Sequence, residues 1–532
     1  MAKSSSPSSR TGRKSKKVDA PARKGRSPKA SQQTRANKLP AKSSRTRAQA
    51  ATVLKAPRPN RAALKRASLC EAALGLKPIK TYQSALDFLA LQVNYERRPP
   101  KRQARGAFTL ARMSRLLKDL GHPEQKFKSV HIAGTKGKGS TAAMLSQMLA
   151  NNGFKVGVYT SPHIVDLRER IAINDELIPK QTLTKLIAKV AEISREYPQS
   201  DRPTFFEILT AIAFLHFAEE QVDVAVLEVG LGGRFDATNL VKPEVCGIVN
   251  ISLDHMAQLG DTVEQIAEEK AGIFKPDIPV VAAPQPSGVK KVLKRVAEQV
   301  GAKLYFAGDE IRFSYRFEAS RGGPQARICV TTPTSHFDHL LVPLVGEHQA
   351  INCGVALGML DQLKNRGFKI DDERAISGLS RVRLQGRMEM LCDQPRVLGD
   401  GAHNAASIEA LMRAIGQNVP YDSMVVIFGC CSDKDIDGML RQIQLGADKI
   451  IFTPIKSPRS ADPADLAAKF AEVSGRMAQV SQSLEEALEI AEKAITREDL
   501  ICITGSFYLV SQAKAIFETH PHRAMSMIVQ TA

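Results

Sequence analysis

The stretch Gly134-Thr-Lys-Gly-Lys-Gly-Ser140 decides the fold, because a short apolar run precedes it and a helical pattern follows it. Residues 130–133 predict a strand, and residues 140–151 predict a helix with Ala, Met and Leu on one face. A second strand is predicted at residues 156–159. Strand, glycine-rich turn, helix and strand form a βαβ unit. Strands this short and unalternating are typical of a buried parallel sheet.

The same alternation of segments continues towards the C-terminus and predicts an α/β fold. Further strands are predicted at residues 222–229, 245–251, 280–283, 396–399, 424–428, 449–452 and 500–504. Helices are predicted at residues 83–93, 108–120, 206–220, 263–274, 289–299, 348–363, 406–415, 436–445, 462–470 and 484–495. Residues 312–332 are more polar and alternating, which favours an antiparallel addition.

Composition and pattern divide the 532 residues into three expected parts. Residues 1–80 are predicted to be a disordered basic tail. Residues 81–385 are predicted to form a P-loop-type domain with a mostly parallel sheet. Residues 386–532 are predicted to form a smaller Rossmann-like α/β domain, joined through a linker at residues 381–387. A basic loop is expected at residues 97–105.

The net charge of +20 is concentrated at the N-terminus. Residues 1–70 hold 20 Lys or Arg and one acid, Asp19, so their charge is 20 − 1 = +19, which leaves +1 for the remaining chain. The tail has almost no large apolar side chains and cannot offset its ordering entropy. We interpret it as a solubilising tail with weak affinity for polyanions. A transit peptide and a misassigned start codon are the alternatives. No specific nucleic-acid partner is expected.

Cysteine usage and hydropathy indicate the compartment. The eight Cys are scattered without a CxxC pair, which favours a reduced, cytoplasmic environment. No apolar run reaches the roughly 18 residues that a membrane span needs, and the tail lacks the apolar region of a secretory signal. We therefore expect a monomeric protein of the cytoplasm with small-molecule partners and no membrane partner.

The glycine-rich turn has the chemistry of a phosphate-binding loop. Its small residues let backbone N–H groups surround phosphates, the following helix N-terminus adds a favourable dipole, and Lys138 adds a point charge. It departs from a strict Walker A sequence because Gly139 separates Lys138 from Ser140. The alternative is a plain glycine-rich turn. The candidate nucleotide-binding residues are Gly134, Thr135, Lys136, Gly137, Lys138, Gly139 and Ser140.

Two further segments place polar residues after apolar strands. In Leu227-Glu-Val-Gly-Leu-Gly-Gly-Arg-Phe-Asp-Ala-Thr-Asn239, Glu228 ends a strand where a carboxylate is costly unless it meets a cation. In Leu253-Asp-His255, His255 is expected at the carboxyl edge of the sheet, where such folds bind ligands. Lys270 follows 15 residues later. Taken alone, Glu228 could be a turn-capping acid, His255 a core histidine and Lys270 a surface lysine.

Together these residues resemble the Mur ligase superfamily, and within it the folylpolyglutamate/dihydrofolate synthase branch. The resemblance covers roughly residues 81–530, and the tail has no counterpart in it. Its motifs are Gly134–Ser140, Thr160-Ser-Pro-His163, Arg168-Glu-Arg170, Thr204-Phe-Phe-Glu207, Glu228–Asn239, Leu253-Asp-His255, Glu269–Lys275, Gly346-Glu-His-Gln-Ala-Ile-Asn352, Gly386-Arg387, Asp400-Gly-Ala-His-Asn404 and Gly505-Ser-Phe507.

The resemblance implies a role for each group of residues. The phosphate loop with Lys138 would hold ATP, and Asn352, Arg387, Asp400 and His403 would complete the nucleotide site. Ser161, Glu228 and His255 would ligate Mg²⁺, with two ions expected and K⁺ as an additional candidate ion. Lys270 would be carbamylated by CO₂, since a carbamate offers the metal an anionic oxygen where an ammonium would repel it. Thr204, Phe206, Arg234 and Asp236 would border the pterin-bearing substrate, and residues 505–507 would help to place glutamate.

The implied reaction joins a folate or pteroate carboxylate to the amine of L-glutamate. ATP first phosphorylates the carboxylate, and the amine then attacks the acyl phosphate, so positioning and cationic groups should dominate catalysis. The sequence departs from the family at Lys136, where Asn is usual, and at the pair Cys430-Cys431. The alternatives are a Mur-type ligase acting on a cell-wall nucleotide precursor, a P-loop switch or motor, and a nucleic-acid-binding protein.

Overall fold

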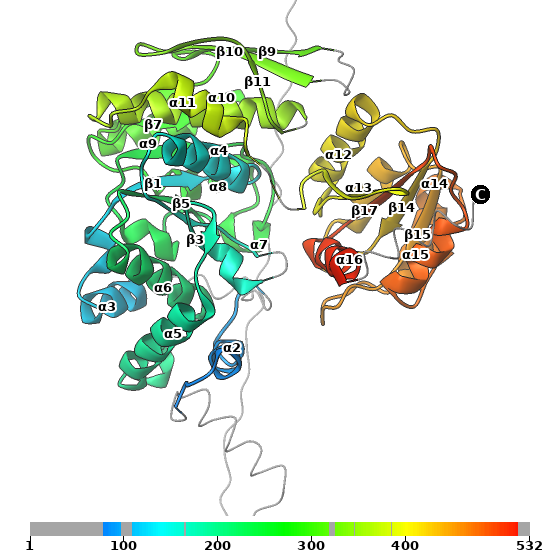
Figure 1. Ribbon diagram of the computed structural model, residues 1–532, viewed down its shortest axis with the longest axis horizontal. Coiled ribbons are helices and arrows are strands. Elements are labelled where there is room, and N and C mark those ends of the chain that lie inside the picture. The colour runs from blue at the N-terminus through cyan, green and yellow to red at the C-terminus, as the bar shows by residue number, and fades with distance from the viewer. Residues whose placement is uncertain are drawn as a thin grey trace, which may run out of the picture. The chain divides into compact units, whose positions relative to one another are not determined.

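The computed structural model describes residues 78–96, 109–163, 166–318, 325–344, 346–382, 384 and 386–519. The predicted tail up to residue 77, the predicted basic loop and two residues of the predicted linker lie outside this range. Two sheets dominate the described chain, one of eight strands and one of six, and a three-stranded sheet is separate from both (Figure 1).

The eight-stranded sheet has the order β4-β3-β2-β5-β1-β6-β7-β8. The run from β2 to β8 is parallel, and β3 and β4 are antiparallel additions at one edge. The strands are β1 Lys128–Ala133, β2 Val156–Tyr159, β3 Ile171–Ile173, β4 Glu176–Leu177, β5 Val224–Glu228, β6 Val245–Ile248, β7 Val280–Ala282 and β8 Leu304–Phe306.

Helices cover both faces of this sheet (Figure 1). They are α2 Tyr82–Ala90, α3 Ala111–Asp119, α4 Lys138–Asn151, α5 Lys180–Arg195, α6 Phe205–Glu219, α7 Met256–Leu259, α8 Val263–Ala271, α9 Ser287–Val300, α10 Glu347–Asn365 and α11 Asp372–Leu379. Short 3₁₀ turns are η2 Pro123–Gln125, η3 Leu167–Arg170, η4 Gln199–Asp201 and η5 Ala237–Leu240.

Strand β5 shows why the sequence forms a two-sided layer. Val224 and Val226 pack into the core beneath α4, α10 and α11, whereas Ala225 and Leu227 pack against α5 and α6 on the opposite face. Because both faces are buried, the strand is apolar throughout instead of alternating. Its last residue, Glu228, is the exception, and it lies at the carboxyl edge of the sheet.

The antiparallel sheet of order β11-β10-β9 consists of β9 Arg312–Glu318, β10 Gln325–Thr331 and β11 His336–Leu341. It confirms the predicted antiparallel addition. Side chains from β10 and β11 join the core that α4, α10 and α11 share.

The six-stranded sheet has the order β12-β13-β17-β14-β15-β16 and is parallel except for β12. Its strands are β12 Glu389–Asp393, β13 Arg396–Gly399, β14 Met424–Phe428, β15 Lys449–Phe452, β16 Gln479–Val480 and β17 Leu500–Thr504. Its helices are α12 Ala405–Asn418, α13 Ile436–Ile443, α14 Pro463–Ser474, α15 Leu484–Glu492 and α16 Phe507–Thr519. α12, α13 and α14 pack on one face, and α15 and α16 pack on the other. The predicted class is confirmed: a mostly parallel α/β unit followed by a smaller Rossmann-like unit.

Two sequence-based expectations bear on the environment of the chain. The seven described cysteines are free, Cys246, Cys329, Cys353, Cys392, Cys430, Cys431 and Cys502. Among the residues that the structure describes, none of the helices combines the length and apolar character needed to cross a bilayer.

Candidate active site

A cavity of about 1610 Å³ lies at the carboxyl ends of the central strands. Its wall contains the whole phosphate loop and most of the other predicted site residues. The predicted residues in the wall, besides the loop, are Ser161, Thr204, Phe206, Glu228, Arg234, Asp236, His255, Lys270, Arg387, His403, Gly505, Ser506 and Phe507. The fold therefore gathers residues that are far apart in sequence around one space.

The phosphate loop joins β1 to α4 and has the geometry that anion binding requires. Gly137 lies at φ +93° and caps α4, which begins at Lys138. A side chain at Gly137 would collide with Asn352 Oδ1, at 2.3 Å from an ideal Cβ. Backbone N–H groups at the start of this 14-residue helix are without intrahelical partners and favour an anion.

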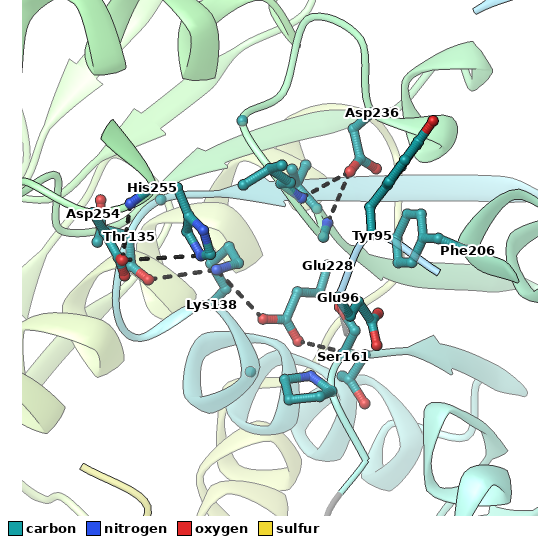
Figure 2. A pocket seen from close by; sticks show the side chains of 18 of the residues that line it. Tyr95, Glu96, Thr135, Lys138, Ser161, Phe206, Glu228, Asp236, Asp254 and His255 are labelled. Atoms are coloured by element: carbon teal, nitrogen blue, oxygen red, sulfur yellow. Dashed lines mark hydrogen bonds and ion pairs between the residues drawn. The ribbon is translucent and has the colours of Figure 1, made fainter. Parts of the chain in front are cut away.

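Lys138 and Glu228 form the central charge pair of the cavity. Lys138 Nζ lies 3.7 Å from Glu228 Oε1 and 3.5 Å from the Thr135 carbonyl oxygen. Ser161 N–H donates to Glu228 Oε2 at 3.2 Å. Figure 2 shows Lys138 reaching towards Glu228, with Ser161 beyond that carboxylate. Burial raises the pKa of Glu228, while Lys138 and the Ser161 N–H favour the ionised form.

Lys270 is the most deeply buried lysine of the site, at 4 % exposure. Its Nζ donates to the Gly134 carbonyl oxygen at 2.8 Å, so α8 is tied to the phosphate loop. Burial, and then repulsion from Lys138, lower the pKa of Lys270 to about 7. A neutral amine is therefore accessible near physiological pH, which is the form that reacts with CO₂.

His255 follows β6 and precedes the short helix α7. It adopts a left-handed conformation at φ +50° and its side chain is 48 % exposed. Its neighbour Asp254 accepts the His255 N–H at 3.0 Å and lies 3.4 Å from Lys136 Nζ. His255 lines the cavity, and its role as a metal ligand stays a prediction.

The expected substrate residues line one wall of the cavity. Thr204 caps α6 and forms a reciprocal capping box with Glu207. Phe206 packs against Gly230, where an added Cβ would lie 2.4 Å from the ring. Asp236 is buried and accepts N–H groups from Gly230 and Leu231 at 3.0 and 2.9 Å. This carboxylate shapes the loop that follows β5.

Arg234 is the more exposed member of this wall. Its backbone N–H donates to the Glu269 carbonyl oxygen at 2.8 Å, and its Nε lies 3.5 Å from Glu269 Oε1. The side chain is 41 % exposed. Arg234 is therefore positioned by α8 and keeps access to the cavity.

The remaining predicted nucleotide-site residues divide into two groups. Arg387 and His403 line the cavity, and Arg387 stacks over the Phe507 ring at 4.7 Å. Asp400 and Asn352 are not part of the cavity wall. Asp400 is buried and accepts N–H groups of Met388 and Ala402 at 3.0 and 2.8 Å, whereas Asn352 lies under the phosphate loop.

Several cavity residues had no assigned role in the sequence. Tyr95 and Glu96 lie close to Phe206 and Ser161 in Figure 2. Arg170, 1 % exposed, holds Glu96 through two hydrogen bonds of 2.8 and 2.7 Å. No local pattern reveals Tyr95 and Glu96, since tertiary contacts bring them to the cavity. The motif that contains Arg170 was recognised without a role for that side chain.

The donor chemistry of this site fits a hard cation beside a polyphosphate. Glu228 and the Ser161 hydroxyl offer oxygen ligands of the kind that Mg²⁺ prefers. Among the described residues, His, Cys, Asp and Glu side chains form no cluster of three that would bind a metal by themselves. A site built from the Glu228 carboxylate, the Ser161 hydroxyl, the His255 imidazole and phosphate oxygens is consistent with that arrangement.

Comparison with known proteins gives the same class. Residues 132–360 match the Mur ligase middle domain, and residues 386–507 match the Mur ligase glutamate ligase domain. The fold and the site define an ATP-dependent ligase of the Mur type.

Individual relatives identify the branch. The chain is 35 % identical over 409 residues to a dihydrofolate synthase/folylpolyglutamate synthase of Bacillus subtilis, covering 76 % of this chain and 94 % of that one. It is 33 % identical over 445 residues to the protein of the same description from Mycobacterium tuberculosis, covering 78 % and 91 %. The chain belongs to the folylpolyglutamate synthase/dihydrofolate synthase family.

Solved structures agree with this assignment. The M. tuberculosis folylpolyglutamate synthase complexed with ADP and AMPPCP matches with a TM-score of 0.72 at 32 % identity, covering 77 % of this chain and 95 % of that chain. E. coli FolC in complex with DHPP and ADP matches with a TM-score of 0.68 at 28 % identity, covering 86 % and 98 %.

Proposed function

We propose that this ligase joins a carboxylate of a folate or of dihydropteroate to the amine of L-glutamate, using ATP and passing through an acyl phosphate. The observation that carries the proposal is the Lys138–Glu228 pair at the N-terminus of α4, inside a cavity that also contains Phe206 and Arg234. One part of this cavity suits a polyphosphate and another suits an aromatic acid.

The phosphate loop supplies the binding energy for the nucleotide. Backbone N–H groups of Gly137 to Ser140 bind phosphate oxygens, and the dipole of α4 favours their charge. Lys138 adds a positive charge beside the phosphates. Arg387, held against Phe507, and His403 complete the nucleotide site from the C-terminal part. Asn352 and Asp400 support the site through the backbone of the loops that they contact.

Ser161, Glu228 and His255 are the residues that would hold Mg²⁺. When bound, Mg²⁺ neutralises charge on the β- and γ-phosphates during phosphoryl transfer. Without it, Lys138 and the Ser161 N–H balance the buried Glu228 carboxylate. The same carboxylate therefore has cationic partners with or without the metal, which keeps a buried charge from being left unpaired.

Lys270 is proposed to be carbamylated. Its buried amine has a pKa of about 7, so a large fraction is neutral and nucleophilic towards CO₂. The carbamate would offer an anionic oxygen next to the phosphate loop, which relieves the repulsion between Lys270 and Lys138.

The acid substrate would occupy the wall formed by Thr204, Phe206, Arg234 and Asp236. Phe206 offers an aromatic face to the pterin ring. Arg234 offers a cation to a carboxylate. Residues 505–507 are proposed to place glutamate, whose amine attacks the acyl phosphate. Exclusion of water by the bound substrates would protect that intermediate from hydrolysis.

The direct test is turnover by the purified full-length chain. With ATP, Mg²⁺ and L-glutamate, phosphate release should require either dihydropteroate or tetrahydrofolate, and the product should be the acid extended by one glutamate. The two acids distinguish dihydrofolate synthase from folylpolyglutamate synthase activity. Absence of glutamate-dependent phosphate release with both acids would refute the proposal. K⁺ dependence, a monomeric state and a cytoplasmic location stay predictions.

A further inference from the structure

Lys136 is a second charged residue of the phosphate loop, and its side chain is bound outside the loop. The loop backbone around it is fixed, because Thr135 N–H donates to the Asn250 carbonyl oxygen at 2.7 Å and Lys136 forms a β-bridge with Asn250. The side chain therefore extends from a rigid base. It is 24 % exposed, so its contacts are largely shielded from water.

Two acceptors from distant segments bind the Lys136 ammonium. Asp254 Oδ2 lies 3.4 Å from Nζ, and His403 Nε2 lies 3.2 Å from it. Asp254 follows β6, whereas His403 lies in the loop between β13 and α12. Lys136 thus connects the phosphate loop with a loop of the six-stranded sheet.

The direction of the Lys136–His403 hydrogen bond follows from the other side of the imidazole. His403 Nδ1 lies 2.8 Å from the Gly401 carbonyl oxygen, which can only accept, so Nδ1 carries the proton. Nε2 of the neutral ring then has a lone pair, and an ammonium is the donor that fits it. Burial and the nearby Lys136 keep the pKa of His403 well below its ordinary value, which is consistent with a neutral ring.

We propose that Lys136 is a positioning residue that couples the nucleotide-bound phosphate loop to the His403 loop. The inference rests on the function proposed above and assigns Lys136 a task different from that of Lys138. Lys138 faces Glu228 and the phosphate position, whereas the Lys136 ammonium forms an ion pair with Asp254 and a hydrogen bond with His403. When the nucleotide orders the phosphate loop, the contacts of Lys136 also order the loop that contains Asp400 and His403.

Side-chain length and charge are both necessary for this coupling. Asparagine is neutral, and its side chain is shorter than that of lysine. Methionine has nearly the length of lysine but no charge and no donor. Arginine keeps charge and donors. Lys136→Met, Lys136→Asn and Lys136→Arg therefore separate the contribution of the ammonium from that of the carbon chain.

The kinetic test compares these variants of the full-length chain. A contact that stabilises the transition state more than the nucleotide complex appears in kcat. Loss of the ion pair with Asp254 and of the charge-assisted hydrogen bond to His403 should lower kcat by about 10- to 100-fold in Lys136→Met and Lys136→Asn. The affinity for a non-hydrolysable ATP analogue should change by less than about threefold, and Lys136→Arg should retain most of kcat. Lys189→Met, which removes a surface lysine paired with Glu219 at 3.7 Å, is the matched control.

A double-mutant cycle tests whether His403 transmits the effect. In a His403→Ala background, Lys136→Met should cost much less than it does in the wild-type chain. Fold-losses of kcat in Lys136→Met and His403→Ala that simply multiply in the double variant would overturn the proposal. So would a kcat of Lys136→Met within about twofold of wild type, or a loss of analogue affinity that parallels the loss of kcat, because the latter identifies a direct phosphate ligand.

A readout independent of turnover separates this proposal from the proposed function. Hydrogen exchange should show that the ATP analogue protects the backbone amides of residues 400–404 in the wild-type chain. Lys136→Met should abolish that protection while the amides of residues 137–140 stay protected. Equal protection of residues 400–404 in both proteins would overturn the coupling even if no substrate acid were turned over. An inactive wild-type chain with the expected exchange pattern would refute only the proposed reaction.

Discussion

At the scale of single residues, the site depends on buried charges whose partners all lie inside the cavity. Glu228 and Lys270 are 5 % and 4 % exposed; Glu228 ends the apolar strand β5, and Lys270 lies in the last turn of α8. Taking such groups out of water is costly unless each finds a partner. The presence of buried groups of both signs in one cavity is therefore consistent with a ligand of high charge.

The first prediction concerns Glu228→Gln, which keeps the shape of the side chain and removes its charge. Phosphate release should fall by at least about 100-fold, because a neutral amide neither balances Lys138 nor binds a divalent cation well. Lys138→Ala should be equally inactive. Glu219→Gln on the exposed end of α6 is the control. Wild-type rates in Glu228→Gln would exclude the proposed metal role.

The second prediction tests the carbamate. Lys270→Ala removes both the amine and its hydrogen bond to Gly134, and should lose most activity. Short carboxylates such as formate or acetate should restore part of it, since they place an anionic oxygen in the space that the side chain leaves. Chloride at equal ionic strength controls for salt. If rates do not recover over a wide range of carboxylate concentration, the carbamate assignment is wrong.

The third prediction uses His131, a fully buried histidine on β1. Its Nε2 lies 2.8 Å from Thr238 Oγ1, and burial, with a contribution from Lys275, lowers the pKa of His131 to about 3. Below pH 6.5 the unfolded chain binds a proton that the folded chain excludes, so the free energy of unfolding decreases as pH falls. One such histidine lowers the free energy of unfolding by about 1.4 kcal/mol for each pH unit below its unfolded-state pKa, which amounts to about 2 kcal/mol at pH 5.

Denaturant unfolding at pH 7 and pH 5 measures this effect. His131→Gln, which does not titrate, should lose about 2 kcal/mol less than the wild-type chain between the two pH values. His336→Gln changes an exposed histidine and should leave the difference as it is in wild type. Identical pH dependence of wild type and His131→Gln would show that His131 does not stay neutral in the folded chain.

At the scale of secondary-structure elements, the substrate wall is set by the close approach of α6 and the loop after β5. Gly230 touches the Phe206 ring because it has no side chain. Gly230→Ala should displace Phe206 and raise KM for the acid substrate by about tenfold, while affinity for the ATP analogue stays unchanged. An unaltered KM would remove Phe206 from the substrate site.

A matched glycine controls for the general effect of an added methyl group. Gly416 lies near the end of α12, and its ideal Cβ meets no atom within 4 Å. Gly416→Ala should therefore leave KM unchanged and stabilise the chain by about 0.5–1 kcal/mol, because alanine is the better helix former.

The elements also show what a sequence can predict. Strands at residues 156–159, 396–399, 424–428, 449–452 and 500–504 were predicted with the observed bounds. Each is a short apolar run between polar turns, so the signal is local. The predicted strand 245–251 ends at Ile248, because the next residues form the loop that leads to Asp254. Its apolar continuation is buried without being paired as a strand.

Other elements were missed for two different reasons. Helices α5 and α16 were overlooked although their sequences carry the helical pattern. In α5, for example, Leu183, Leu186, Ile187 and Val190 form one buried apolar face, which is enough to predict a helix. Edge strands such as β4 and β16 have only two residues each. Their pairing depends on neighbours distant in sequence, which no local pattern encodes. The positions of Tyr95 and Glu96 at the cavity depend on tertiary contacts in the same way.

At the scale of the whole molecule, the candidate site lies in the part of the chain after residue 70, which has a net charge of only +1. A strongly basic segment precedes that part. The candidate site could be predicted because its residues occur in ordered motifs after apolar strands. The Lys136–Asp254–His403 contacts could not, because they join three loops that are separated by more than 100 residues each. Charge distribution, in contrast, is fully readable from the sequence, and it leads to the last prediction.

Deleting residues 1–66 should leave ligase activity intact. These residues have a net charge close to that of the whole chain, and the cavity-lining residues that the structure describes begin at Asn94. The truncated chain should match the full-length chain in kcat and in the KM values for ATP, acid and glutamate. It should lose binding to heparin or DNA that the full-length chain shows at low salt, because binding by dispersed Lys and Arg depends on counterion release.

A full-length variant with the same tail composition in scrambled order separates the effect of charge from that of sequence. It should bind heparin or DNA as the wild type does. Loss of turnover on truncation would instead assign the tail a catalytic or folding role, and salt-resistant binding would show specific recognition of a partner by the tail.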